Sequence, residues 1–349
     1  MANPYHGRPD YTFWRQGVAD RALSGVDPVV RAPFSLSRGD LIATAGSCFA
    51  QHISRTLTER GFRYLVTENF EPYPGATNEN YGVFPARFGN IYTTRQLVQL
   101  FDRAYRAFVP KVDYWVRQDR AVIDPFRPRI QTSGFPTADN LRADRERHLS
   151  AVRRMFETCD AFIFTLGLTE AWISAADGAV FPLAPGAVAS DLADSDYRFH
   201  NFSTFEVVDD LIGFLDRLNS VNPTAKVILT VSPVPLIATY EDRHVLVSTV
   251  ASKSILRAAV EEVIRQKPGL AYFPSYEIVT GPQTGGRFYA PDLREVTAEG
   301  VSYVMSLFSR HYLGDGEASL LPAGGLNAED LRRMTELAGI VCDETAIVR

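Results

Sequence analysis

Residues 41–61 of the chain read LIATAGSCFAQHISRTLTERG. The first five are mainly apolar, and Gly46-Ser47-Cys48 follows them directly. Apolar residues then recur at four-residue spacing through 49–60, which is the period of a helix, and Gly61 is well placed to end that helix. This stretch therefore predicts a strand, a tight turn and a helix, the opening unit of many α/β folds.

The same alternation of apolar strands and helices continues along the chain. Further strands are expected at 161–166, 226–231 and 270–274, and further helices at 94–108, about 137–159, 205–219, 247–266 and 297–312. The run at 161–166 is almost continuously apolar, which is typical of a strand whose two faces are both covered. The pattern predicts a parallel sheet with helices on both faces.

The domain organisation that we expect follows from this pattern. Residues 1–38 contain several prolines and short turns and read as an irregular lead-in. Residues 39–313 form the α/β domain, with a loop or hairpin insertion around 109–137. Residues 314–349 form an extension that begins with Gly and Ala and includes a short helix at 328–337.

The composition narrows the class of protein. The chain has 349 residues, of which 46% are hydrophobic and 22% charged, and this is ordinary for a globular protein. A net charge of −5 argues against a large basic surface for nucleic acid. The three cysteines are far apart and form no metal-binding pattern, so we expect neither a metal site nor a disulfide scaffold.

Targeting signals are not evident. The first fifteen residues, MANPYHGRPDYTFWR, lack the apolar run of a signal peptide, and no stretch approaches the ~20 apolar residues of a membrane helix. We therefore expect a cytoplasmic protein without a membrane span. The sequence leaves its oligomeric state open.

Ligands of an open parallel sheet bind beyond the carboxyl ends of its strands. The segments expected there are Gly46-Ser47-Cys48, 167–170, 232–235 and 274–277. A cysteine between a strand and a helix N-terminus is well placed to act as a nucleophile, because the helix terminus favours the thiolate. The alternative interpretation of Cys48 is a small buried apolar residue, as most lone cysteines are.

The chain resembles the GSCFA family, which is named for the motif at 46–50. Five further segments are similar to that family: 88–92, 165–172, 232–236, 252–254 and 272–277. The resemblance covers roughly residues 30–312. It implies a place near the SGNH (GDSL-like) hydrolases and hence a three-layer α/β/α, flavodoxin-like fold.

The resemblance also implies a set of site residues. Cys48 takes the nucleophile position with Ser47 beside it, and Gly89, next to Asn90, resembles the oxyanion-hole glycine. In the third block, Gly167 is followed by Thr169 where those hydrolases have asparagine, and Glu170 comes next. In the last block Asp292 matches the orienting aspartate, but Glu295 stands where the histidine base is expected.

Another histidine would then have to serve as the base. The candidates, in order, are His244 and His200, both in loops, and His52, one helical turn after Cys48. Each has the alternative of an ordinary solvated or hydrogen-bonded histidine. We expect Lys253, in the motif 252–254, to be a solvated or phosphate-contacting lysine, and the charged face of 142–154 to be exposed.

These expectations lead to two hypotheses of function. The first is an esterase or acyltransferase that acts on an acylated carbohydrate or a related ester through Cys48. It needs no cofactor, although acyl-CoA is possible as a co-substrate. The alternative is a non-catalytic module that binds a saccharide or an acyl group, and the missing histidine favours it.

Overall fold

The structure is a computed structural model, and it describes residues 3–72, 77–190, 192–314 and 346–347. The helix expected at 328–337 lies outside the described residues. The described chain divides into two compact units. The larger comprises residues 36–273 with the pair 346–347, and the smaller comprises the described residues up to 35 and from 274 to 314.

A five-stranded parallel sheet forms the centre of the larger unit, in the order β10-β9-β5-β1-β2. Its strands are β1 (Leu41–Gly46), β2 (Arg63–Tyr64), β5 (Ala161–Leu166), β9 (Lys226–Val231) and β10 (Ala271–Phe273). Every residue of β5 is buried, as its continuous apolar sequence predicts for a central strand. Counted along the chain, this is the 2-1-3-4-5 order of flavodoxin-type sheets.

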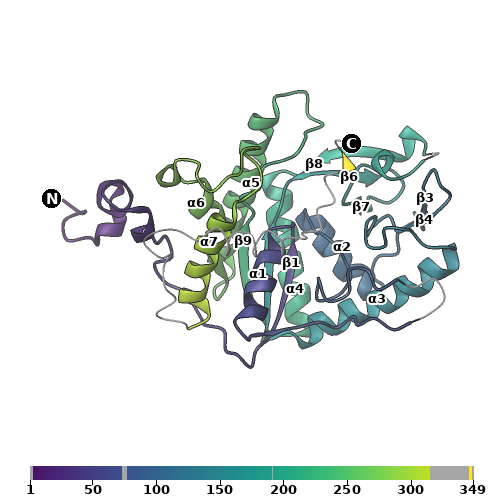
Figure 1. Cartoon of the computed structure of the whole chain (residues 1–349), viewed down its shortest axis with the longest axis horizontal. Helices are drawn as coiled ribbons and strands as arrows, with labels where there is room; N and C mark the ends of the chain where they lie inside the picture. The colour runs from purple at the N-terminus through teal and green to yellow at the C-terminus, as the bar shows by residue number, and fades with distance from the viewer. Residues whose placement is uncertain (1–2, 73–76, 191, 315–345, 348–349) are drawn as a thin grey trace. The chain divides into compact units, whose positions relative to one another are not determined.

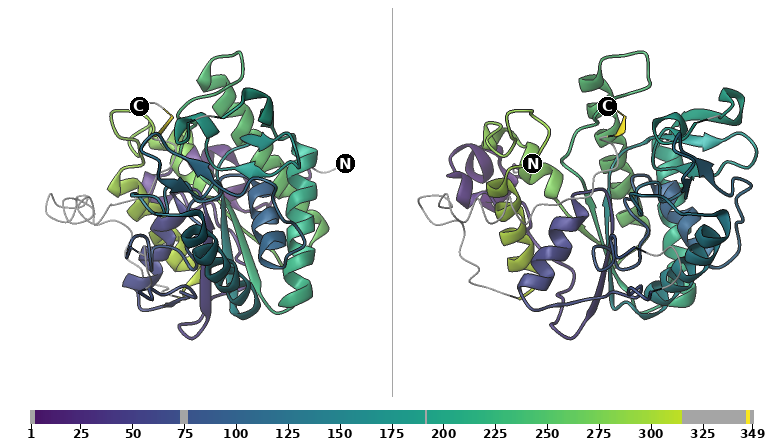
Figure 2. Two further views of the ribbon diagram at one scale, coloured as in Figure 1. Left: turned by 90° about the vertical axis from the view of Figure 1, so that its right-hand side faces the viewer. Right: turned by 45° about the vertical axis from the view of Figure 1, so that its right-hand side comes forward.

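Helices cover both faces of this sheet, so the predicted α/β/α architecture is confirmed (Figures 1 and 2). One face carries α1 (Ala50–Glu59), and the other carries α2 (Thr94–Ala104), α3 (Ala138–Thr158), α4 (Thr204–Val221) and α5 (Val245–Gln266). The split follows from right-handed crossovers, because the chain moves one way across the sheet from β1 to β2 and then the other way from β2 to β5, β9 and β10.

Most helices begin at the capping residues that the sequence offers. Thr93 and Gln96 form a capping box at the start of α2, and Ser203 and Glu206 form another at the start of α4. Helix α2 ends at Ala104, four residues earlier than predicted, because Arg106 adopts a left-handed conformation with φ +58°.

The Arg-rich face of α3 is largely exposed, as expected, but another face of the helix carries buried polar residues. Arg142, Arg147 and Arg154 are exposed, but Asp144 and His148 are buried. Their spacing places them on the inner face of the helix, where Asp144 pairs with two buried arginines, Arg87 and Arg127.

Two small antiparallel sheets accompany the main one. Within 109–137, β3 (Trp115–Val116) pairs with β4 (Val122–Ile123). A three-stranded sheet, β7-β6-β8, follows β5 directly and consists of β6 (Glu170–Ser174), β7 (Val180–Phe181) and β8 (Tyr197–Asn201). This second sheet lies beyond the carboxyl end of β5 (Figure 1), and the sequence pattern did not predict it.

The smaller unit contains α6 (Ser275–Thr280) and α7 (Ala298–Tyr312). Specific polar contacts attach the N-terminal segment to α7. The hydroxyl of Tyr303 donates to the carbonyl oxygens of Leu23 and Val26, and Asp27 pairs with Arg310 and His311. In neither unit is a described helix both long enough and apolar enough to traverse a lipid bilayer.

Candidate functional site

The turn after β1 carries Ser47 and Cys48, and Gly46 makes it possible. Gly46 has a φ of +140°, and a Cβ at this position would lie 2.3 Å from the carbonyl oxygen of Thr165 on the neighbouring strand β5. Any larger residue would therefore push β1 and β5 apart. Glycine allows the two strands to remain paired up to the point where the chain turns into α1.

This turn lies where the strand order reverses, since β2 pairs with one side of β1 and β5 with the other. A small pocket opens there, lined by Ser47, Cys48, Tyr92, Gly167, Leu168, Ser232, Val234, Pro235 and Leu236. Its volume of about 10 Å³ leaves room for about one water molecule. Its walls are the ends of β1, β5 and β9, so three of the segments expected at the sheet edge meet here.

The two thiols that the structure describes lie in different environments. Cys48 is partly exposed in the pocket, whereas Cys159 is buried behind α3. Burial raises the pKa of the Cys159 thiol to about 12, because a thiolate there would lose its hydration. Of these two cysteines, only Cys48 is both reachable and at the sheet edge.

Ser47 contributes a second polar group to the same pocket. Its hydroxyl oxygen is buried, and it has no hydrogen-bond partner among the described residues. Buried hydroxyls are normally paired. The Ser47 hydroxyl can therefore donate to a ligand atom that enters the pocket.

The loop at 88–92 closes one side of the pocket. The N–H of Ile91 donates to the carbonyl of Gly46, and the carbonyl of Tyr92 accepts from the N–H groups of Gly167 and Leu168. Gly167 fits tightly, since a Cβ there would lie 3.1 Å from the Tyr92 oxygen and 3.2 Å from the Ser47 Cβ. These backbone contacts fix the three pocket segments relative to one another.

Helix α5 holds the far side of the loop at 167–169 with two consecutive residues. The Nζ of Lys253 donates to the Gly167 carbonyl at 2.6 Å, and the Ser252 hydroxyl accepts from the Thr169 N–H at 3.0 Å. Lys253 is only 1% exposed. The expectation of a solvated lysine is therefore wrong, because Lys253 lies on the inner side of α5 and its ammonium group is bonded to the loop.

The side chains of Thr169 and Glu170, both expected in the site, are used elsewhere. The Thr169 hydroxyl donates to Asn201 Oδ1 at 2.7 Å and is 3.1 Å from Ser252 Oγ. Glu170 accepts from the hydroxyl of Thr239 and the N–H of Tyr240. Both side chains thus secure neighbouring loops, and neither is among the described residues that line the pocket.

Gly89 and Asn90 lie near the site but face another small cavity, which they line together with Arg127. Asn90 is buried, and its Oδ1 accepts from Gln51 Nε2 on α1 at 3.3 Å. Gly89 and Asn90 are therefore not among the described residues that line the Cys48 pocket.

None of the described histidines lines the Cys48 pocket. His244 is exposed and caps α5, with its Nδ1 accepting from the Leu246 N–H. His200 on β8 bonds Glu206 at 2.7 Å.

His52 packs edge-on against Phe49, and burial, with a contribution from Arg55, lowers its pKa to about 4. His52 is therefore neutral at pH 7, and it extends from α1 one turn beyond Cys48.

Asp292 and Glu295 belong to the smaller unit. Asp292 is exposed, and its Oδ1 accepts from the backbone N–H groups of Arg294 and Glu295, which lower its pKa below the usual range. This is the hydrogen bonding of a local turn. No group of three or more potential metal ligands occurs in the described part of the chain.

Fold and site together define an α/β protein with a flavodoxin-type sheet and a reachable cysteine where the strand order reverses. The model of the GSCFA family matches residues 41–308. This match covers more than half of the chain, so the protein belongs to the GSCFA family. No curated protein matches the sequence.

Proposed function

We propose that this protein is an esterase or acyltransferase in which Cys48 accepts the acyl group. The observation that carries the proposal is the position of Cys48, a partly exposed residue in a pocket at the switch point of the sheet. It is next to Ser47, whose hydroxyl has no partner among the described residues. It also lies two residues ahead of α1, whose N-terminal dipole favours a negatively charged sulfur.

The chemistry that we propose has two steps. The Cys48 sulfur attacks the acyl carbonyl, a thioester forms, and the bond to the leaving alcohol breaks, with the thiol proton passing to that alcohol. Water or an acceptor hydroxyl then attacks the thioester, releases the acid or a new ester, and returns a proton to the sulfur. The Ser47 hydroxyl donates to the carbonyl oxygen as it becomes negative.

The pocket walls support a small acyl group as the part that is transferred. Leu168, Val234, Pro235 and Leu236 offer an apolar surface, but the pocket has room for about one water molecule as it stands. An acetyl group would enter after a small movement of the loop at 232–236. Acyl-CoA suits a thiol acceptor as donor, because exchange between two thiols is nearly balanced in energy.

We further propose that the family belongs with the SGNH hydrolases and acts on acylated carbohydrates. The sheet order and the chain order of Gly46-Ser47-Cys48, Gly89 and Gly167 support this placement. The carbohydrate rests on analogy between folds. A reducing compartment such as the cytoplasm suits a catalytic thiol.

One observation favours the alternative, a non-catalytic module that binds a saccharide or an acyl group. The Thr169 hydroxyl is already bonded, and none of the described histidines lines the pocket. A site without a base beside its nucleophile can still bind a ligand.

Turnover separates the two functions. Release of p-nitrophenol from p-nitrophenyl acetate, and of CoA from acetyl-CoA with and without a mixture of sugars, is measured for the native protein, Cys48→Ala and Cys159→Ala. The enzyme proposal predicts that Cys48→Ala lowers the rate at least ~100-fold, while Cys159→Ala retains it. Equal rates for native protein and Cys48→Ala, with saturable sugar binding by calorimetry, would support the binding module.

A further inference from the structure

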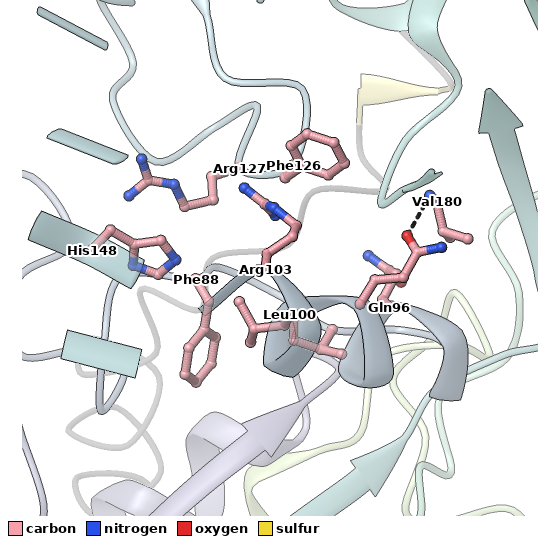
Figure 3. Close-up of a pocket in the computed structure, with 10 residues that line it drawn as sticks. Phe88, Gln96, Leu100, Arg103, Phe126, Arg127, His148 and Val180 are labelled. Carbon is pink, nitrogen blue, oxygen red and sulfur yellow. Dashed lines mark hydrogen bonds between the residues drawn. The ribbon is translucent and has the colours of Figure 1, made fainter. Parts of the chain in front are cut away.

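A second cavity lies between α2, α3 and the insertion that carries β3 and β4, and its polar lining is unusual (Figure 3). It has a volume of about 20 Å³. Its polar lining residues are Gln96, Gln99, Arg103, Arg127 and His148, and the rest are apolar. No described carboxylate lines it.

Arg103 is the exception among the buried arginines around this cavity. Arg87 pairs with Asp144 and Glu68, and Arg127 pairs with Asp124 and Asp144. The guanidinium of Arg103 has neither a hydrogen bond nor an ion pair with any described residue, and its Nη2 is buried.

The ring of Phe126 lies beside this cation, with its centroid 3.8 Å from the Arg103 Cζ (Figure 3), and the buried Asp124 carboxylate acts on it through its charge without forming an ion pair with it. An aromatic face attracts a cation, but it accepts no hydrogen bond along the edge of the guanidinium. A guanidinium with five N–H donors, almost entirely removed from water, therefore still lacks acceptors in its plane.

Gln96 adds a second donor to the lining. Its Oε1 accepts from the backbone N–H groups of Tyr92 and Thr93, and these two bonds fix which end of the amide is oxygen. The Nε2 group is therefore directed away from that loop. Gln96 is buried and lines the cavity, so its amide group can donate to a ligand there.

His148 adds no charge to the cavity. Its Nδ1 is bonded to Glu68 at 2.8 Å, and its Nε2 has no partner among the described residues. Burial, together with nearby Arg127, lowers the pKa of His148 to about 4, so the ring is neutral. Burial likewise lowers the pKa of Arg103 to about 9, which leaves the guanidinium charged at pH 7.

We propose that this cavity is a binding site for a small monovalent anion of halide size, held by the Arg103 guanidinium and the Gln96 amide. The charge fits, because the buried Arg103 guanidinium has no ion pair with a described residue and no described carboxylate lines the cavity. Asp124, whose charge acts on Arg103, is already paired with Arg127. The size fits as well, since a water molecule needs ~10–15 Å³ and a chloride ion is similar. A tetrahedral oxyanion such as sulfate is too large.

The cavity has room for the anion and at most one water, and such a water would donate to His148 Nε2. Phe88 and Ile91 also line this cavity, while Tyr92 lines the Cys48 pocket. The loop at 88–92 therefore separates the two sites, and the anion would brace it from the side opposite Cys48.

Thermal unfolding of the full chain tests the proposal. The midpoint is measured in sodium chloride and in sodium gluconate at equal ionic strength, because gluconate is too large for the cavity. A ligand that binds only the folded state raises the midpoint, and at about 100 times its dissociation constant we expect a rise of about 2–5 °C. Arg103→Met, which keeps an unbranched side chain but removes the charge, should abolish the difference between the salts.

Arg147→Met is the matched control, because Arg147 is exposed on α3 next to His148; it should respond to chloride as the native protein does. Crystals of the native protein soaked in bromide supply a measurement that does not depend on a variant folding, with an anomalous peak expected beside Arg103. Any of three results would overturn the proposal. They are equal midpoints in the two salts, a chloride response that persists in Arg103→Met, and a cavity that holds only water in the bromide crystals.

Discussion

The Nζ atom of Lys253 lies 2.6 Å from the carbonyl oxygen of Gly167, and this contact joins helix α5 to the loop that walls the Cys48 pocket. The same peptide group is held at its other end, because the N–H of Leu168 donates to Tyr92. A buried ammonium group on one side of a peptide strengthens the hydrogen bond made on the other side. Lys253 therefore positions the pocket wall.

Replacing Lys253 with methionine tests this role. Lys253→Met keeps most of the side-chain volume but leaves the Gly167 carbonyl without this donor, so we expect the free energy of unfolding to fall by about 1–3 kcal/mol in urea. Lys267→Met, just past the end of the same helix, removes only a surface ion pair with Asp216 and should change it by less than about 1 kcal/mol. Identical unfolding curves and identical exchange of the Leu168 amide hydrogen in native and Lys253→Met protein would contradict the role.

Gly46 should tolerate no side chain. In Gly46→Ala the new Cβ would meet the Thr165 carbonyl oxygen at 2.3 Å in a conformation that L residues rarely adopt, so we expect a loss of about 3 kcal/mol or more. Gly186→Ala is the control, since nothing lies within 4 Å of a Cβ there. Denaturant unfolding measures both, and a Gly46→Ala protein as stable as Gly186→Ala would show that the turn is wrongly described.

The two described thiols should differ widely in reactivity. Native protein treated with iodoacetamide at pH 8 should be labelled at Cys48 more than ~100-fold faster than at Cys159, because the latter is buried and its pKa is raised to about 12. Peptide mass mapping after timed quenching separates the sites. If both cysteines were labelled only after addition of urea, Cys48 would not be reachable and the nucleophile proposal would lose its basis.

Stability should fall as the pH falls below about 6.5. Burial lowers the folded-state pKa of His148 from its ordinary value of 6.5 to about 4, so between these values the unfolded chain binds the extra proton. Each such group contributes up to about 1.4 kcal/mol per pH unit. His52 behaves in the same way.

The variant His148→Gln should reduce the slope of unfolding free energy between pH 6.5 and 4.5 by up to one proton, whereas His6→Gln, at the exposed N-terminal segment, should leave it unchanged. Buried carboxylates with a lowered pKa, such as Glu68, lose their contribution only below this window. A slope that His148→Gln does not alter would mean that this histidine is protonated in the folded state.

The main sheet was predictable because its signals are local. Strands β5 and β9 are short apolar runs, and α1 follows Gly46-Ser47-Cys48 with four-residue periodicity. The sheet β7-β6-β8 was not predictable in this way. Glu170 pairs with Asn201 across thirty-one positions, and a mixed sequence such as 170–174 carries no clear alternation.

Two buried polar features are marked in the sequence by their position on an apolar helix face. Lys253 precedes Leu256 and Val260 by three and seven positions, so it lies on the apolar stripe of α5. On α3, Asp144 and His148 fit the same stripe as Leu141 and Met155. Charged residues in register with buried apolar ones indicate a buried polar network. By contrast, the hydrogen bonds that occupy Thr169 depend on long-range contacts and leave no mark in the sequence.

Intact-mass spectrometry after incubation with p-nitrophenyl acetate and, separately, with acetyl-CoA tests the central claim about Cys48 most directly. The account predicts one acetyl adduct on native protein and on Cys159→Ala, located at Cys48 by peptide mapping and absent from Cys48→Ala. No adduct from either donor, on a protein whose Cys48 is nevertheless alkylated in the folded state, would contradict it.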